Sequence, residues 1–288
     1  MHKKDIDQIS GTETTGHEWD GIKELDTPMP RWWLGTFFAC IAWAIGYWVV
    51  MPAWPLLNGY THGLLNHSQR DDVTANLVAL RAARAAKEHA LTTATLPQIQ
   101  ANPDLLQFAL AEGKATFGDN CAACHGAGAQ GARGYPNLND DVWLWGGTLV
   151  DIQHTITVGV RSTSPDTRQS QMPSFGRDAI LKPEQVDDLT EYVVHLSGRP
   201  ADATAVKRAT PLFAQNCAAC HGPAGKGNRQ MGAPNLTDNE WLYGPKREDI
   251  HDQIWNGHGG VMPTWGGRLS PETIKALAIY VHSLGGGE

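Results

Sequence analysis

The sequence Cys-Ala-Ala-Cys-His occurs twice, at residues 121–125 and 217–221, each time after Asn and before Gly. Two thiols separated by two residues and followed by a histidine form the attachment signature of c-type haem. The thiols bond to the haem vinyl groups, and the adjacent imidazole ligates the iron. We therefore predict two covalently bound haem c groups, attached through Cys121, Cys124, Cys217 and Cys220, with His125 and His221 as proximal iron ligands.

A zinc or thiol-redox site is the alternative interpretation of two CxxC pairs. Neither copy is accompanied by a second CxxC or an HxxxH that would complete a tetrahedral zinc site. The fifth cysteine, Cys40, lies in an apolar stretch, so no cysteine pair remains for a disulfide framework. Haem attachment is therefore favoured over zinc binding.

The sixth iron ligand decides whether a haem transfers electrons or binds gases and peroxides. Met172 and Met262 each begin a Met-Pro segment that continues to an aromatic residue and a glycine, QMPSFG and VMPTWG. A thioether raises the reduction potential and closes the iron to external ligands. We predict Met172 and Met262 as the two distal ligands, and His258 is the best rival because it lies close to Met262.

An uncharged segment near the N-terminus predicts a membrane anchor. The 26 residues from Trp32 to Leu57 are apolar, and a spanning helix needs about 20. Tryptophans flank both ends, as is typical of membrane interfaces. No cleavage site for a signal peptide follows Met51, so the segment is interpreted as a retained signal-anchor. Because haem c is attached in the periplasm of Gram-negative bacteria, we expect a single pass of the inner membrane, a cytoplasmic N-terminus and periplasmic haem domains.

The distribution of charge argues against nucleic-acid binding. The formal net charge is −7, and Lys and Arg are not gathered into a basic stripe. Residues 108–200 hold 7 basic and 11 acidic side chains. An acidic face suits a basic redox partner, although solubility alone would also explain it.

The second half of the chain is an internal repeat. FGDNCAACHG matches FAQNCAACHG, PNL recurs, and each copy closes with a helix that follows a proline. Helix-packing contacts are expected within each copy, Phe117 with Tyr192 and Phe213 with Tyr280. A helix is also expected over 71–91, with one apolar side that packs on another element. The predicted organisation is a tail (1–31), an anchor helix (32–57), a helical spacer (58–107) and two haem-binding domains (108–200 and 201–288).

These motifs resemble class I cytochrome c, and the run HEWDGIKELDTPMPRWW from His17 to Trp33 resembles the dihaem CcoP (FixP) family of cbb3-type cytochrome c oxidase subunits. The resemblance covers essentially the whole chain and implies a mainly helical fold. It also implies electron transfer from a donor cytochrome c to a monohaem cytochrome subunit and a haem–copper catalytic subunit. The eight cysteine, histidine and methionine positions named above carry over directly.

Two matters remain open from the sequence. In the resembled family the methionines can be assigned crosswise, Met262 to the first haem and Met172 to the second, whereas compact domains favour pairing within each copy. A cytochrome subunit of a periplasmic dehydrogenase is an alternative function, and a dihaem peroxidase is a more distant one, because both copies retain a methionine.

Overall fold

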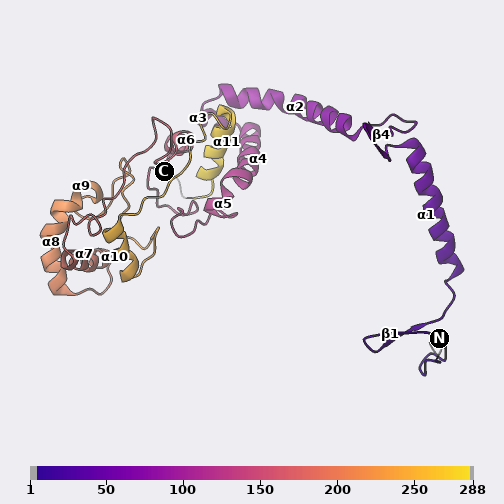
Figure 1. Cartoon of the computed structure of the whole chain (residues 1–288). Coiled ribbons are helices and arrows are strands. Elements are labelled where there is room, and N and C mark those ends of the chain that lie inside the picture. Colours follow the sequence, from indigo (N-terminus) through magenta and orange to yellow (C-terminus); the bar gives the residue numbers. More distant parts are fainter. Residues whose placement is uncertain (1–4, 286–288) are drawn as a thin grey trace. The chain divides into compact units, whose positions relative to one another are not determined.

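The computed structural model describes residues 5–285, and within them the fold is mainly helical, as predicted (Figure 1). The described chain divides after Ala82 into two compact units. Its elements are β1 (Thr14–Trp19), β2 (Ile22–Leu25), α1 (Arg31–Val50), β3 (Pro55–Leu56), β4 (Gly59–Tyr60), α2 (Gln69–Thr93), α3 (Leu96–Ala101), α4 (Pro103–Asn120), α5 (Ala122–His125), α6 (Leu149–Val158), α7 (Pro183–Leu196), α8 (Ala203–Asn216), α9 (Ala218–His221), α10 (Arg247–Asn256) and α11 (Pro271–His282).

The N-terminal unit begins with an antiparallel hairpin that the sequence analysis did not anticipate. Strands β1 and β2 pair with Trp19 opposite Ile22. The turn between them is Asp20-Gly21, and both residues have positive φ, 49° and 84°. That conformation matches the right-handed twist of a hairpin and is favoured by Asp-Gly. A local turn signal therefore explains this hairpin.

The predicted membrane anchor forms helix α1, and none of its side chains is buried. By length and composition it is the one described helix able to cross a membrane. The helix ends at Val50, so residues 51–57 of the apolar segment lie beyond it and lead into the β3–β4 hairpin. Pro52 accounts for the end, because proline lacks the backbone N–H that continues a helix.

Helix α2 confirms the helix predicted over 71–91 and extends it slightly at both ends. The side expected to pack is not buried over most of its length: Val73, Leu77 and Leu80 are about half exposed. Only Leu91, near the end, is buried. There it joins a small core with Ile99 and Ala276, from α3 and α11.

In the C-terminal unit, helix α11 packs against α4, the helix that carries the first motif. The two helices approach so closely that a Cβ added to Gly113 would lie 2.4 Å from the carbonyl oxygen of Ala276. Phe117 and Tyr280 meet beside this crossing, with ring centroids 5.5 Å apart. Together with α3, α5 and α6 these helices form what we call the split module, residues 95–158 with 262–285.

Helix α7 packs instead against α8, the helix that carries the second motif. Tyr192 and Phe213 lie 4.9 Å apart between ring centroids, and Phe213 is almost fully buried. Helices α7 to α10 share one apolar core. We call this part the continuous module, residues 172–256, because an uninterrupted stretch of chain builds it.

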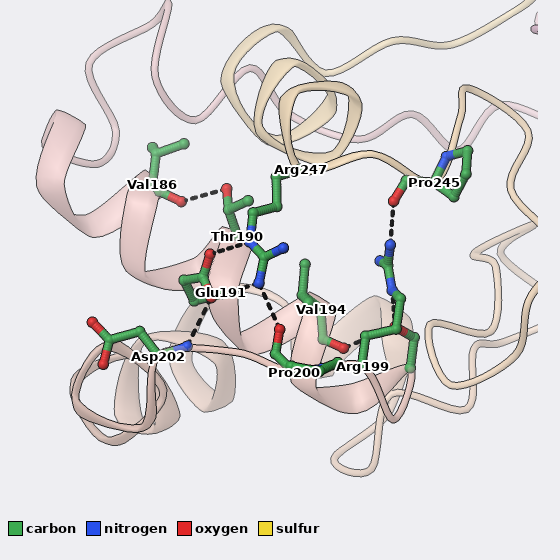
Figure 2. A network of polar contacts seen from close by, with 10 residues as sticks. Val186, Thr190, Glu191, Val194, Arg199, Pro200, Asp202, Pro245 and Arg247 are labelled. Carbon is green, nitrogen blue, oxygen red and sulfur yellow. Dashed lines mark hydrogen bonds and ion pairs between the residues drawn. The ribbon is translucent and has the colours of Figure 1, made fainter.

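Polar contacts tie the continuous module together around the end of α7 (Figure 2). Arg247 at the start of α10 donates to the Glu191 carboxylate of α7 at 2.7 Å and to the Pro200 carbonyl at 2.6 Å. The backbone N–H of Asp202, the N-cap of α8, donates to the same carboxylate at 2.9 Å. Arg199 donates to the carbonyl of Pro245. The Glu191 carboxylate thus links α7 to the beginnings of α8 and α10.

The Met-Pro segment of each sequence copy lies in the module that carries the motif of the other copy. Backbone N–H to carbonyl hydrogen bonds of 3.0 Å run in both directions between Val160 and Met262, which puts the second Met-Pro segment beside α6. Correspondingly, the N–H of Phe175 donates to the Ile254 carbonyl, which puts the first Met-Pro segment beside α10. The predicted contacts within each sequence copy, Phe117 with Tyr192 and Phe213 with Tyr280, are therefore wrong. Each closing helix packs on the other copy.

Candidate haem sites

Each CxxCH motif forms the same compact turn. The first cysteine caps the preceding long helix in an αR conformation, at Cys121 after α4 and at Cys217 after α8. The next four residues form a single helical turn, α5 or α9. This turn brings both thiols and the histidine of a motif to one side of the chain, as attachment to one ring requires.

The histidine of each motif is held by the carbonyl of the proline in the recurring PNL sequence. Nδ1 of His125 lies 3.0 Å from the Pro136 oxygen, and Nδ1 of His221 lies 3.0 Å from the Pro234 oxygen. A carbonyl only accepts, so Nδ1 carries the proton and Nε2 keeps a free lone pair. In metal-ligating histidines, the ring nitrogen that does not bind the metal typically has a hydrogen-bond partner of this kind.

Burial keeps these groups uncharged. Desolvation lowers the pKa of both His125 and His221, and the carbonyl contact only partly opposes it. Burial also raises the pKa of the Cys121 thiol and of the Cys217 thiol to about 11, with a smaller contribution from the second cysteine of each motif. Neutral imidazoles suit iron ligation.

The structure brings Met172 to the second motif. Met172, Cys217, Cys220 and His221 line a single cavity with largely apolar walls. The two attachment cysteines and the two predicted iron ligands of one haem thus converge on one space, and the residues present fit that group. Met172 also packs on the core that contains Phe213.

Met262 lies at the first motif, where Met262, Cys121 and Ala122 all pack against the core that contains Phe117. Trp143 belongs to the same cluster, and its buried indole Nε1 has no hydrogen-bond partner among the described residues. An unpaired buried donor fits a site completed by a polar group of a cofactor. Of the two assignments that the sequence leaves open, the crosswise one matches this placement, because the chain crosses between the modules before each Met-Pro segment.

His258, the rival ligand named because it is close to Met262 in the sequence, lies at the second site and not beside Met262. It lines the cavity with Met172, and its Nε2 is 2.6 Å from a carboxylate oxygen of Asp252. Its ring is 5.4 Å from that of Tyr243. The position of His258 in the sequence, near Met262, therefore does not indicate its place in the fold.

The cavity at the second motif also includes residues that sequence reasoning missed. Leu144, Trp145 and Arg161 reach it from the first copy, and Gln253 reaches it from α10. The Arg161 guanidinium donates to the carbonyls of Gly260 and Ser170, and burial lowers its pKa. Trp-Leu recurs at 143–144 and 241–242 and was a usable signal for Leu144, but not for Trp145. Nothing in the sequence pattern marked Arg161 or Gln253.

Two helical modules with a CxxCH turn, a carbonyl-bound histidine and an inward methionine define a protein with tandem cytochrome c domains. Residues 110–197 match the family described as Cytochrome c. Residues 204–281 match Cytochrome C oxidase, cbb3-type, subunit III. Residues 11–58, which include the hairpin and α1, match the N-terminal domain of cytochrome oxidase-cbb3, FixP.

Relatives of full length agree with these matches. The chain is 55% identical over 288 residues to the cbb3-type cytochrome c oxidase subunit FixP of Bradyrhizobium sp. (strain ORS 278), covering 99% of this chain and 98% of the relative. It is 48% identical over 295 residues to the subunit CcoP of Azospirillum brasilense, covering 100% of both chains. The chain belongs to the FixP/CcoP family of cbb3-type cytochrome c oxidase subunits.

The protein is therefore a membrane-anchored subunit of a cbb3-type oxidase, and it transfers electrons in respiration. The match to the FixP N-terminal domain distinguishes it from a cytochrome subunit of a dehydrogenase and from a dihaem peroxidase. Two cytochrome c domains imply binding of haem c.

Proposed function

We propose that the chain holds two covalent haem c groups whose axial ligands come from both sequence copies. The first haem is attached through Cys121 and Cys124 and ligated by His125 and Met262. The second is attached through Cys217 and Cys220 and ligated by His221 and Met172. The observation that carries this proposal is the convergence of Met172, Cys217, Cys220 and His221 on one cavity.

When bound, each haem supplies a one-electron couple, and the protein residues set its conditions. The histidines present a neutral Nε2 to the iron, because their Nδ1–H groups are held by Pro136 and Pro234. The methionine thioethers would supply the second protein ligand of each iron and would exclude external ligands. The apolar walls keep water away, which favours electron transfer with little rearrangement of the surroundings.

Electrons enter from a donor cytochrome c and leave toward a monohaem cytochrome c subunit and the haem–copper catalytic subunit. Helix α1 anchors the chain in the bacterial inner membrane, with the N-terminal hairpin cytoplasmic and both modules periplasmic. Membership of the oxidase family and the exposed, uncharged surface of α1 support this arrangement. Covalent haem attachment outside the cytoplasm supports the orientation.

Variants that keep a single haem test the ligand assignment. With Cys121 and Cys124 both changed to Ala, only the second haem remains, and a haem-stained denaturing gel verifies that state. In this background Met172→Ala should open the iron to carbon monoxide, whereas Met262→Ala should leave it six-coordinate. Carbon monoxide binding after Met262→Ala alone would contradict the crosswise assignment, and binding after neither change would exclude both methionines at this haem.

A further inference from the structure

The thioether of Met172 has a hydrogen-bond donor beside it. The side-chain amide Nε2 of Gln253 lies 3.7 Å from the Met172 sulfur and 3.1 Å from the backbone carbonyl oxygen of His258. The Gln253 Oε1 is buried and has no partner among residues 5–285. Because the amide oxygen has no partner, the contacts of the NH2 group orient the amide. Those contacts are the Met172 sulfur and the His258 carbonyl.

The corresponding methionine has no such donor. Thr155 occupies the position in α6 that Gln253 occupies in α10, because both lie four residues before the glycine that ends the helix. The Thr155 hydroxyl donates to the Asp151 carbonyl and accepts from Nε of Arg168, so it is engaged elsewhere. In the described part of the chain, no hydrogen bond reaches the sulfur of Met262.

A hydrogen bond to an axial thioether changes the balance between the two iron oxidation states. An N–H that donates to the sulfur withdraws electron density from the lone pairs that ligate the iron. Ferric iron depends more on that donation than ferrous iron, so the ferrous state gains relative stability. Hydrogen bonding to the ligands is one of the means by which a protein sets a haem potential.

We propose that Gln253 is a positioning residue that raises the reduction potential of the second haem through its hydrogen bond to Met172. The inference rests on the proposed ligation of that haem by Met172. It adds a functional difference between two sites built from the same motif: the donor is present at the second site and absent at the first. The second haem is therefore the one whose potential depends on an amide in α10.

The full-length protein with both haems tests this inference through redox titration followed by absorbance. Gln253→Leu removes the donor and should lower the potential of one haem. We expect a three- to tenfold change in its ferric-to-ferrous ratio at fixed solution potential, which for one electron corresponds to a shift of up to about 59 mV. The other haem should titrate as in the unchanged protein.

Gln215→Leu is the matched control. Gln215 is exposed on α8 in the same module, so the same chemical change there should move neither potential. Gln253→Glu is the second variant for the case in which Gln253→Leu does not retain haem. It keeps the shape of the side chain but replaces the N–H donor by a carboxylate oxygen, so it should lower the potential at least as far. Unchanged potentials in both Gln253 variants would overturn the inference.

The near-infrared charge-transfer absorption of methionine-ligated ferric haem separates the two proposals. If this absorption persists in a Gln253 variant while neither potential changes, Met172 remains a ligand and the tuning role of Gln253 is excluded. If Met172→Ala leaves the absorption of both haems intact, the proposed ligation itself fails. A lowered potential with the absorption retained supports both proposals.

Discussion

The split module and the continuous module descend from one sequence pattern but select different closing helices. At the crossing with the closing helix, α4 has Gly113 and α8 has Ala209 at matching positions. The residues just before them are Glu112 and Arg208. Arg208 pairs with Asp188 of α7 through contacts of 2.8 and 2.5 Å, and Asp188 is almost fully buried.

These differences explain why the closing helices pair crosswise. If α7 packed on α4, the Asp188 carboxylate would face Glu112, and like charges in a partly buried contact repel. If α11 packed on α8, the Cβ of Ala209 would fall where Gly113 leaves room beside the Ala276 carbonyl. Arg208 would also face Ala276, which occupies in α11 the place of Asp188 in α7. The repeated motifs thus determine where each helix forms. A few side chains at the helix crossings determine which closing helix packs on α4 and which on α8.

The largest expected difference concerns which segment folds separately. Residues 170–258 contain α7 to α10 and the whole core of the continuous module, so this segment should take up one haem and unfold cooperatively. Residues 201–288 form a complete sequence copy but lack α7, and we expect them to retain little stable structure. Haem-stained gels and thermal melts followed by circular dichroism measure both properties. A stable haem protein from 201–288 would show that α11 can replace α7, and the crossing residues would then not determine the pairing.

A change at each helix crossing should affect the two modules differently. Gly113→Ala places a Cβ against the Ala276 backbone, and we expect a loss of about 1–3 kcal/mol in the stability of the split module. Ala209→Gly creates no clash and should cost about 1 kcal/mol through helix propensity. Denaturant unfolding of the full chain, monitored at each haem, provides the measurement. An equal or smaller loss for Gly113→Ala would mean that α11 can shift away without cost.

The smallest expected effect is a dependence of the continuous module on acid. The side-chain hydrogen bond from Arg247 lowers the pKa of the Glu191 carboxyl, and the Asp202 N–H adds to this effect. A carboxylate with a depressed folded-state pKa stabilises the fold above its unfolded pKa of about 4.3, and this contribution is lost as the pH falls through the folded-state pKa. The Arg247 side chain is half exposed, so solvent screens the ion pair and the effect should be modest.

Melting temperatures at neutral and acid pH test that linkage. Glu191→Gln removes the titrating group and should flatten the acid dependence of the continuous module. Lys246→Gln, a change at the neighbouring basic residue, is the control and should leave the dependence as it is. A slope that is the same in all three proteins would show that this carboxylate contributes nothing to acid unfolding.

Much of this protein could be predicted from local sequence. The CxxCH turns need only five consecutive residues, and the closing helices begin at prolines, so Pro183 and Pro271 located them correctly. The uncharged Trp-rich segment predicted α1, although its end at Val50 depended on Pro52. The hairpin at Asp20-Gly21 was not predicted, although Asp-Gly is itself a local hairpin signal.

Only the tertiary structure decided which copies of these elements meet. Spacing along the chain places Met172 after the first motif and His258 beside Met262, yet both line the cavity of the second motif. The same limit applies to the aromatic pairs and to Gln253, whose amide meets a sulfur 81 positions away. Periodicity and motifs report interactions within a few residues, whereas the choice between two nearly identical helices depends on contacts such as Gly113 with Ala276 and Arg208 with Asp188. Those contacts exist only once the chain has folded.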